Sequence, residues 1–249
     1  MPMLCATDND VSTNASAAHV LRRLHETPVD TDPFPHCVVP GILPDDLYAR
    51  AVAHWPVTEE LRLLQLGDLP LRFQAVIDDK WLATQPPERA AVWREVRDAL
   101  FNPDVVELMS DRFPQIREKL KWTGRPPMLV ARIIEDHAGH AMLPHTDMEA
   151  TLFSMLVYMP ENDVPEDGGA PQLGTALYRP RDPEFRGRGF DRYPREDFEL
   201  VGHAPYRPNH LLTYSPSDRS FHGVEPVAPP CVRRLLIFFA IIDSRIPRR

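Results

Sequence analysis

Two histidines and one aspartate, far apart in the chain, constrain the fold of this sequence most strongly. His145 and Asp147 flank Thr146, and His222 follows 77 residues after His145. In an extended strand, residues i and i+2 point to the same side, so His145 and Asp147 can bind one ion while Thr146 faces away. For His222 to reach that ion, its own strand, expected at 220–227, must lie beside the strand of His145. A β-barrel or jelly roll provides such neighbouring strands.

The surrounding sequence strengthens this interpretation. An H-x-D tripeptide alone is a weak signal, because it arises easily by chance in a chain with ten histidines. Here, strand-like runs at 128–134 and 151–159 flank the tripeptide, and another at 233–242 follows His222. Two imidazoles and a carboxylate on one side of a metal leave positions open, which suits oxygen chemistry at non-haem Fe(II). The ordered set therefore predicts a metal site.

From residue 128 onward, short apolar runs are separated by Gly and Pro. This texture predicts eight strands, the number in a double-stranded β-helix or jelly roll. The expected strands are 128–135, 141–147, 151–159, 172–178, 197–203, 210–214, 220–227 and 233–242. The 28 prolines of the chain fall mostly at proposed strand ends and in loops, where a missing N–H costs least. We therefore expect a mainly β, α+β chain with supporting helices.

The segments before residue 128 are expected to support this core. With 249 residues, of which 43% are hydrophobic, the chain can bury one full core, so a single catalytic domain is expected. Residues 1–33 are polar and predict a flexible arm with a short helix at 17–25. Residues 34–127 predict a strand and helices that pack on the barrel, and residues 128–249 the catalytic core with an insert at 160–198. The individual elements expected in 34–127 are a strand and turn at 34–43 and helices at 44–55, 87–101 and 103–120.

This ordered set resembles the Fe(II)- and 2-oxoglutarate-dependent oxygenases, whose pattern is H-x-D, a distant His, and an Arg about ten residues later on the last core strand. The resemblance covers roughly residues 128–242, about half of the chain. It implies that His145, Asp147 and His222 are the iron ligands and catalytic residues, and that Fe(II), 2-oxoglutarate and O₂ are required. It also implies hydroxylation or another oxidation of a small molecule, with decarboxylation of 2-oxoglutarate to succinate. The carboxylate of Asp147 argues against halogenation, since halogenating members have a small residue there.

The resemblance also implies an arginine that binds the far carboxylate of 2-oxoglutarate. A planar guanidinium suits this role because it can donate two parallel hydrogen bonds. Arg233 and Arg234 are adjacent, so a strand sends them to opposite faces and one of the two can be the anchor; we favour Arg233. The family often has Ser or Ala two places later, whereas Leu235 or Leu236 stands there in this chain.

Further candidates for contact with the co-substrate or substrate are Arg132 and Tyr158, on the first and third core strands. Each could equally be a packed side chain with its tip at the surface. The insert at 160–198 is the expected source of substrate specificity. Its six arginines would suit an anionic substrate, but interleaved acidic residues nearly cancel their charge, so a solvated loop is the favoured interpretation. These arginines are Arg179, Arg181, Arg186, Arg188, Arg192 and Arg195.

The composition limits the kinds of partner that this protein is expected to bind. The net charge of −8 offers no basic surface for nucleic acid or an anionic membrane, and no apolar run approaches the roughly 20 residues of a membrane span. The start of the chain lacks the features of a secretory signal, so a cytoplasmic protein is expected. Three cysteines make a disulfide framework improbable. A free metabolite, such as an amino acid or an intermediate of specialised metabolism, is the favoured substrate, and the oligomeric state is not predicted.

Two other readings stay open. One is a cupin-like metalloenzyme that uses the same ligands without a 2-oxo acid, or a zinc hydrolase that uses two histidines, a carboxylate and water. The other is a non-catalytic binding protein on a jelly-roll scaffold, since a fold does not prove an activity. A basic residue that reaches the metal-containing pocket would favour the 2-oxo acid.

Overall fold

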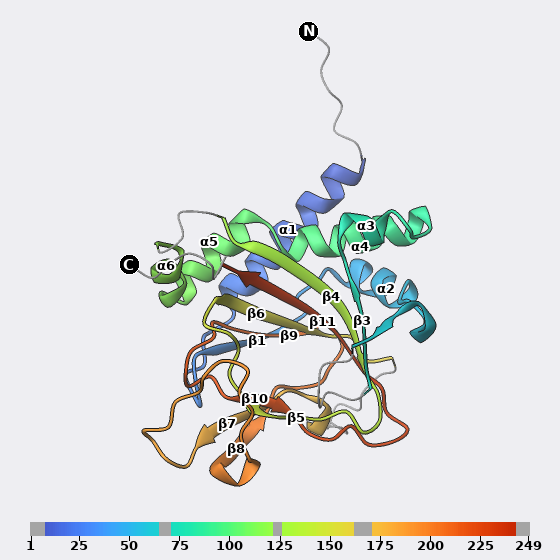
Figure 1. The fold of residues 1–249 in the computed structure, drawn as a ribbon. Coiled ribbons are helices and arrows are strands. Elements are labelled where there is room, and N and C mark those ends of the chain that lie inside the picture. Colours follow the sequence, from blue (N-terminus) through green and yellow to red (C-terminus); the bar gives the residue numbers. More distant parts are fainter. Residues whose placement is uncertain (1–7, 65–70, 122–125, 162–170, 243–249) are drawn as a thin grey trace.

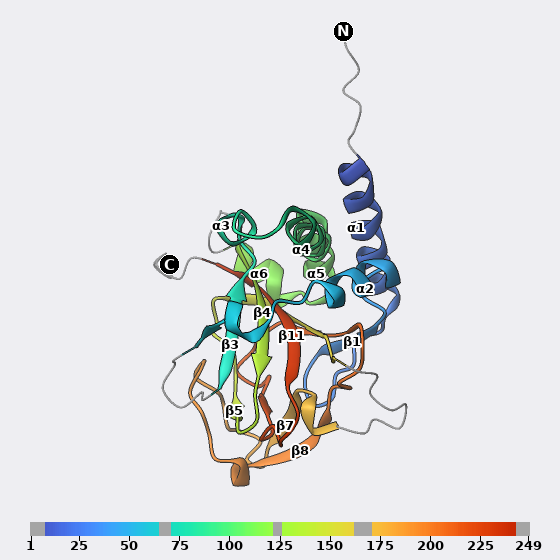
Figure 2. The same cartoon turned by 90° about the vertical axis from the view of Figure 1, so that its right-hand side faces the viewer.

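Two antiparallel β-sheets lie face to face in the computed structural model, which describes residues 8–64, 71–121, 126–161 and 171–242. Helices cover the outer face of the larger sheet (Figures 1 and 2). The larger sheet contains, in order, β1 (His36–Pro40), β9 (His210–Tyr214), β6 (Thr151–Tyr158), β11 (Arg233–Ile241), β4 (Met128–Asp136), β3 (Arg72–Val76) and β2 (Arg62–Leu63). The smaller sheet contains β5 (Met142–His145), β10 (His222–Val224), β7 (Ala176–Pro180) and β8 (Phe198–His203). This architecture confirms the predicted double-stranded β-helix with supporting helices.

Strand β11 explains how the larger sheet separates two cores. It pairs with β4 along one edge and with β6 along the other, and its two faces pack in two different hydrophobic clusters. Leu235 and Ile237 face the smaller sheet, whereas Leu236 and Phe238 belong to the core under the helices. A strand buried on both faces needs a continuous apolar sequence, which is what β11 has. Burial of each such side chain stabilises the fold by roughly 1.5–3 kcal/mol.

The boundaries of several helices follow from capping residues and prolines in the sequence. The helices are α1 (Asp8–Glu26), α2 (Asp45–Ala53), α3 (Asp79–Leu82), α4 (Pro87–Leu100), α5 (Pro103–Arg112) and α6 (Gln115–Lys121), with short 3₁₀ turns η1 (Thr58–Glu60), η2 (Pro171–Leu173) and η3 (Arg195–Asp197). Asn102 caps α5 by accepting a hydrogen bond from the Val105 N–H at 3.1 Å. The single helix predicted at 103–120 is divided at Phe113, because the following Pro114 disfavours helical backbone in the residue before it. None of the described helices is long and apolar enough to cross a membrane.

The N-terminal segment differs from the prediction of a flexible arm with a short helix. Its helix, α1, has 19 residues. Val20 and Leu24 are buried in the core under the larger sheet, and Ser16 donates a hydrogen bond to Glu95 of α4 at 2.8 Å. Most residues of this segment are polar, so its composition does not reveal the few apolar residues, such as Val20 and Leu24, that pack in the core.

Strand boundaries also differ near the predicted metal site. The strand expected at 141–147 ends at His145, and the strand expected at 220–227 is reduced to His222–Val224. Asp147 therefore follows the end of β5 rather than lying within it. Strands β2 and β3 were not predicted, yet β3 pairs along β4 and carries Arg72 and Gln74 to the interior of the barrel.

Candidate metal centre

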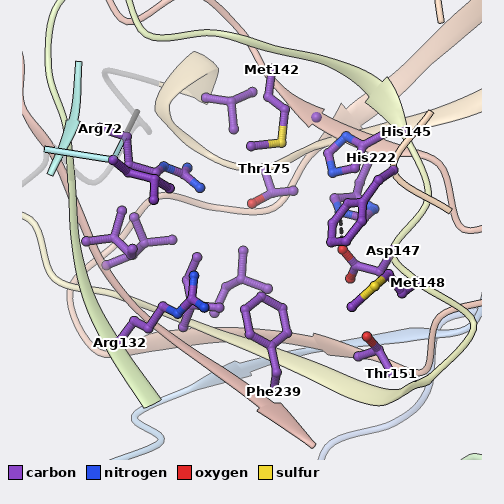
Figure 3. Close-up of a pocket in the computed structure, with 18 of the residues that line it drawn as sticks. Arg72, Arg132, Met142, His145, Asp147, Met148, Thr151, Thr175, His222 and Phe239 are labelled. Atoms are coloured by element: carbon purple, nitrogen blue, oxygen red, sulfur yellow. Dashed lines mark ion pairs between the residues drawn. The ribbon is translucent and has the colours of Figure 1, made fainter. Parts of the chain in front are cut away.

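His145, Asp147 and His222 meet at one side of a cavity between the two sheets (Figure 3). One ligand atom from each lies within 4.8 Å of the others, and all three side chains are buried. His145 ends β5 and His222 begins β10, and the two are direct partners in that antiparallel pair. Such partners hold their Cβ atoms about 5 Å apart. Strand pairing thus brings together the two imidazoles that the sequence separates by 77 residues.

Backbone carbonyls fix which nitrogen of each histidine is free. Nδ1 of His145 donates to the Leu143 carbonyl at 2.9 Å, and Nδ1 of His222 donates to the Ser220 carbonyl at 2.9 Å. A carbonyl oxygen only accepts, so the proton of each neutral ring lies on Nδ1 and the lone pair on Nε2. Burial lowers the pKa of His145 to about 3, with a further contribution from His222. His145 is therefore a neutral ring with a free nitrogen, the form that binds metals.

The carboxylate of Asp147 is oriented by two hydroxyl groups of the larger sheet. Its Oδ2 accepts hydrogen bonds from Ser154 Oγ at 2.7 Å and from the Tyr214 hydroxyl at 3.0 Å. Its other oxygen, Oδ1, lies 3.7 Å from Nε2 of His222. Burial, followed by the charge of Asp147, raises the pKa of Tyr214 well above its usual value, so the phenol stays protonated. Contacts of this kind hold a metal-ligating carboxylate in one orientation.

These donors fit a divalent transition metal. Two Nε2 lone pairs and one carboxylate oxygen converge from one side, and the cavity lies on the other side, where further ligands could bind. Nitrogen and oxygen donors in this 2-His-1-carboxylate set are typical of non-haem Fe(II). The donor chemistry of the site therefore matches the metal that the sequence predicts.

The cavity has a volume of about 580 Å³ and two kinds of wall. Its apolar wall includes Ile134, Leu156, Leu235, Ile237 and Phe239 of the larger sheet. Opposite His145, Asp147 and His222, the side chains of Arg72 and Arg132 extend toward the interior (Figure 3). A largely apolar cleft with a few charged groups is the usual form of a small-molecule site.

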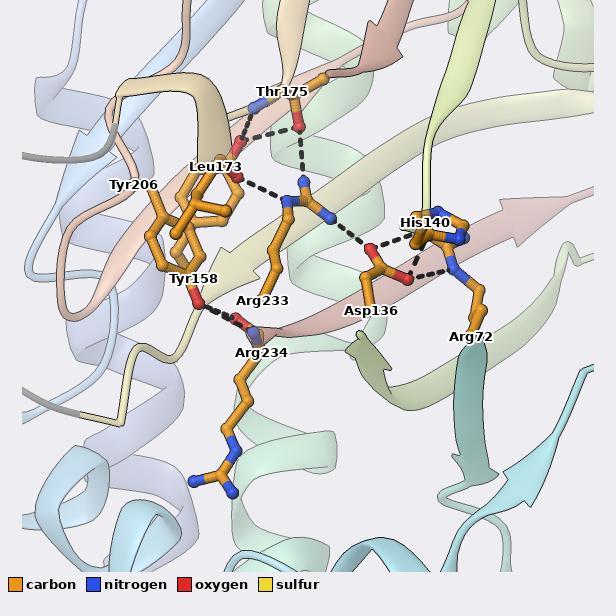
Figure 4. Close-up of polar contacts among 9 residues, drawn as sticks. All are labelled: Arg72, Asp136, His140, Tyr158, Leu173, Thr175, Tyr206, Arg233 and Arg234. Carbon is orange, nitrogen blue, oxygen red and sulfur yellow. Dashed lines mark hydrogen bonds and ion pairs between the residues drawn. The ribbon is translucent and has the colours of Figure 1, made fainter. Parts of the chain in front are cut away.

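Arg233 is a buried cation of this cavity, held in a network (Figure 4). It donates to Asp136 Oδ2 at 2.8 Å, to Thr175 Oγ1 at 3.2 Å and to the Leu173 carbonyl. Arg72 binds both oxygens of Asp136 at 2.6 and 2.9 Å. Burial alone would raise the pKa of Asp136, but Arg72 and Arg233 outweigh it and lower the pKa to about 2. Two guanidinium groups therefore share one carboxylate, and the network keeps a positive charge.

Arg234 points to the opposite face of β11 (Figure 4). Its Nε donates to Glu135 at 2.9 Å, and its guanidinium lies 5.7 Å from the centre of the Trp55 ring, under the helices. Of the two adjacent arginines, Arg233 is the one that lines the cavity.

The two secondary candidates have different positions. Arg132 of β4 lines the cavity. Tyr158 does not line it, but is fully buried behind it, where its hydroxyl donates to Thr175 Oγ1 at 2.8 Å and accepts from the Thr175 N–H at 3.1 Å. Tyr158 thus positions Thr175, which in turn binds Arg233. Sequence reasoning missed Arg72, Asp136 and Thr175, because no spacing rule connects them to the H-x-D segment.

The insert covers the H-x-D segment, although most of its arginines point elsewhere. The N–H groups of Phe190 and Tyr193 donate to the carbonyls of Thr146 and Pro144 at 2.8 and 3.0 Å. In the described part of the insert, Arg192 alone of the six arginines lines the cavity. Arg179 and Arg195, for example, form ion pairs with Glu199 and Glu225. Three of the six arginines, Arg179, Arg186 and Arg195, therefore take part in ion pairs with acidic side chains.

Of the comparisons with known proteins, the one with solved structures bears on the fold. No family model and no curated protein matches this chain. Among solved structures, a prolyl hydroxylase from Trichoplax adhaerens, in complex with a hypoxia inducible factor oxygen degradation domain peptide fragment, is 14% identical with a TM-score of 0.52, and the match covers 96% of this chain and 94% of that one. Prolyl 4-hydroxylases from Phytophthora capsici match at 14% identity and a TM-score of 0.51, over 99% of this chain and 70% of that one. The chain therefore has the double-stranded β-helix fold of the prolyl hydroxylases, as its resemblance to the Fe(II)/2-oxoglutarate oxygenases implied.

Proposed function

We propose that this protein is a non-haem Fe(II)/2-oxoglutarate-dependent oxygenase that hydroxylates, or otherwise oxidises, a small molecule. The observation that carries the proposal is one cavity lined by both His145, Asp147 and His222 and by the buried guanidinium of Arg233. The three ligands would hold Fe(II), and Arg233 would bind the far carboxylate of 2-oxoglutarate. When bound, Fe(II) and 2-oxoglutarate supply the activation of O₂, with release of succinate and carbon dioxide.

The strand register supports this division of roles. Leu177 of β7 is the partner of His222, and Thr175 lies two residues before it. Two extended residues span about 7 Å. This separation is comparable with the length of a five-carbon diacid, which could reach from the metal to Thr175 and Arg233. Each terminal nitrogen of Arg233 carries a second N–H beyond those given to Asp136 and Thr175, so donors for a carboxylate remain.

The protein's own contribution is to position the reactants and exclude water. Ser154 and Tyr214 orient Asp147, and the Asp136 network orients Arg233. The apolar wall around Leu156 and Phe239 would displace water from the substrate. Fixing reactants in this way can account for a large part of a rate acceleration. The substrate class predicted from composition, a free metabolite such as an amino acid or a specialised-metabolism intermediate, stays part of this proposal.

The metal-ligand and arginine roles can be separated by two variants. We expect Asp147→Ala to lose Zn²⁺ binding, used here as a redox-inert substitute for Fe(II), by about 100-fold or more, because one of three ligands is removed. We expect Arg233→Met to keep Zn²⁺ binding but to weaken 2-oxoglutarate binding by about 100-fold, because hydrogen bonds between charged groups are lost. Isothermal titration calorimetry, with Zn²⁺ added first and 2-oxoglutarate second, measures the two affinities of each variant.

Arg234→Met is the matched control, because this neighbouring arginine points away from the cavity. It should bind metal and 2-oxoglutarate like the unaltered protein. Metal binding without any binding of 2-oxoglutarate to the unaltered protein would favour the cupin-like or hydrolase alternatives. No metal binding at all would favour a non-catalytic jelly-roll protein.

A further inference from the structure

Arg132 differs from Arg72, Arg233 and Arg234 of the same sheet because, in the described part of the chain, it has no carboxylate partner. Arg72 and Arg233 share Asp136, and Arg234 binds Glu135. Among the described residues, no carboxylate forms an ion pair with Arg132. Its Nε is buried without a hydrogen-bond partner, and Nη1 makes a long contact of 3.3 Å with the Gln74 amide oxygen. A partly buried cation without a counter-ion is costly in a folded protein.

The surroundings of Arg132 make this cost larger. The side chain is partly buried and faces the cavity, where Phe239 lies nearby on the same sheet (Figure 3). Burial lowers the pKa of its guanidinium, and the positive charge of Arg72 lowers it further. These effects all disfavour the cation as it stands, and an anion bound in the cavity would reverse them.

Arg132 and Arg233 start from well-separated positions on the larger sheet. Arg233 is the strand partner of Asp136, and Arg132 lies four residues earlier on β4, opposite Ile237. Four extended residues span about 13 Å. Ile134 and Leu235 lie between the two positions on the cavity wall. The cavity therefore has two separate cationic positions with an apolar surface between them.

The charged residues that line the cavity also favour the binding of an anion. Four arginines line it, Arg72, Arg132, Arg192 and Arg233, whereas Asp147 is the single carboxylate among its described lining residues. The whole chain, in contrast, carries a net charge of −8. The carboxylates of Asp136 and of one 2-oxoglutarate do not account for Arg132, which lies at the other end of the wall. A second organic anion would.

We infer that the primary substrate is a carboxylic acid with an apolar body, and that Arg132 binds its carboxylate. The apolar body would lie along Ile237 and Phe239, with the carboxylate on the wall opposite the metal ligands. This inference rests on the proposed function, because it names the substrate class of the same site. Arg132 is then a specificity-determining residue, distinct from the co-substrate anchor Arg233.

The test uses full-length protein loaded with Zn²⁺ and 2-oxoglutarate, so that the co-substrate position is filled and no turnover occurs. The probes are octanoate and 4-phenylbutyrate, each compared with its neutral amide, and binding is measured by ligand-observed NMR and calorimetry. We expect the unaltered protein to prefer each carboxylate to its amide by about tenfold or more, as expected for a charge-assisted contact. Arg132→Met should remove this preference, Arg132→Lys should keep part of it, and Arg181→Met, an insert arginine that does not line the cavity, should keep all of it.

Several results would overturn the inference. It fails if the loaded protein binds none of the four probes, if carboxylates and amides bind equally, or if Arg132→Met keeps the full preference. It also fails if Arg132→Met loses 2-oxoglutarate instead, since Arg132 would then belong to the co-substrate. The proposed function is tested separately, by loading. If 2-oxoglutarate does not bind to the metal-loaded protein, that proposal fails, and the same probes on the metal-loaded protein still decide whether Arg132 selects carboxylates.

Discussion

Tyr214 connects two of the proposed metal ligands, Asp147 and His222, to the larger sheet. Its hydroxyl lies 3.0 Å from Asp147 Oδ2 and 2.9 Å from His222 Nε2. A metal bound to Nε2 would take that lone pair, which leaves the hydroxyl proton for Asp147. The ring itself packs against Phe34, at 5.6 Å between centroids. Tyr214 thus combines a packing role with a hydrogen bond that orients a ligand.

The hydroxyl of Tyr214 can be removed without removing its ring. We expect Tyr214→Phe to weaken metal binding by about tenfold, because loss of a hydrogen bond behind a ligand typically has an effect of this size. Competition with a chelating dye measures the affinity. Tyr206→Phe is the control, since Tyr206 is also buried but binds the Arg234 backbone instead. Equal metal affinities in the two variants would show that Tyr214 does not support the site.

Gly187 of the insert packs directly on Thr146, the residue between two of the proposed metal ligands. A Cβ atom at this position would lie 2.6 Å from both Cγ2 and Oγ1 of the buried Thr146. We expect Gly187→Ala to displace Thr146 and to weaken metal binding by about tenfold, an effect typical of disturbed ligand orientation. The double variant with Thr146→Ala should recover most of the loss, as measured by the same chelator competition. Gly202→Ala, where a Cβ meets nothing within 4 Å, should bind metal normally, and an equal effect there would contradict this account.

At the scale of single residues, the spacing of residues in the sequence predicts some contacts of the site but not those that depend on strand register. The H-x-D spacing and the distant histidine predict that His145, Asp147 and His222 can meet, and the structure brings them together. Tyr214 and Ser154 reach Asp147 because they are direct partners across β6 and β9. That pairing depends on the register of two strands 60 residues apart, which no local pattern encodes.

Helix α6 is joined to the larger sheet through one buried cation, Lys119. Lys119 donates to the carbonyls of Thr151 and Pro216 at 2.8 and 2.9 Å, where β6 begins and where the segment after β9 turns away. Burial lowers the pKa of Lys119 from 10.5 to about 8. The helix therefore fixes two loop segments with a group whose charge is costly in the folded state.

This cost makes stability depend on pH. Since the folded pKa of Lys119 lies below the unfolded one, the unfolded chain binds the proton more tightly, and stability rises with pH between about 8 and 10.5. We expect the free energy of unfolding of the metal-free protein to increase across this window by about 3 kcal/mol more than that of Lys119→Met. Denaturant titrations at several pH values measure it. Parallel pH curves for the two proteins would mean that Lys119 has an ordinary pKa.

At the scale of elements, long apolar segments could be predicted from the sequence, whereas short and partly polar segments could not. The eight strands from residue 128 onward were expected, because apolar runs between Gly and Pro mark them. Strands β2 and β3 were missed although β3 alternates polar and apolar residues from Arg72 to Ala75, because two and five residues are too few for a clear periodicity. The polar residues Arg72 and Gln74 of β3 face the cavity. The missing β3 also hid Arg72, one of the two arginines that bind Asp136.

At the scale of the whole molecule, the larger sheet separates the hydrophobic core under the helices from the cavity between the two sheets. The face of the larger sheet under the helices carries a large apolar cluster with one buried ion pair, Arg234 with Glu135, whereas its inner face carries Arg72, Arg132, Arg233 and Asp136 beside apolar residues. Helices and barrel share one hydrophobic cluster, from Val20 and Trp93 to Phe238. This shared cluster lets the inner face hold buried charges without loss of the fold, because most of the stabilising burial occurs on the other side.

The most direct test of this account is the anaerobic addition of Fe(II) and then 2-oxoglutarate to metal-free protein, followed by visible absorption. A 2-oxo acid chelated to Fe(II) gives a charge-transfer band in this region. We predict that the band forms in the unaltered protein and is absent in Asp147→Ala. Iron binding without the band, or an equal band in the variant, would contradict the assignment of His145, Asp147 and His222 as the centre of a 2-oxoglutarate-dependent oxygenase.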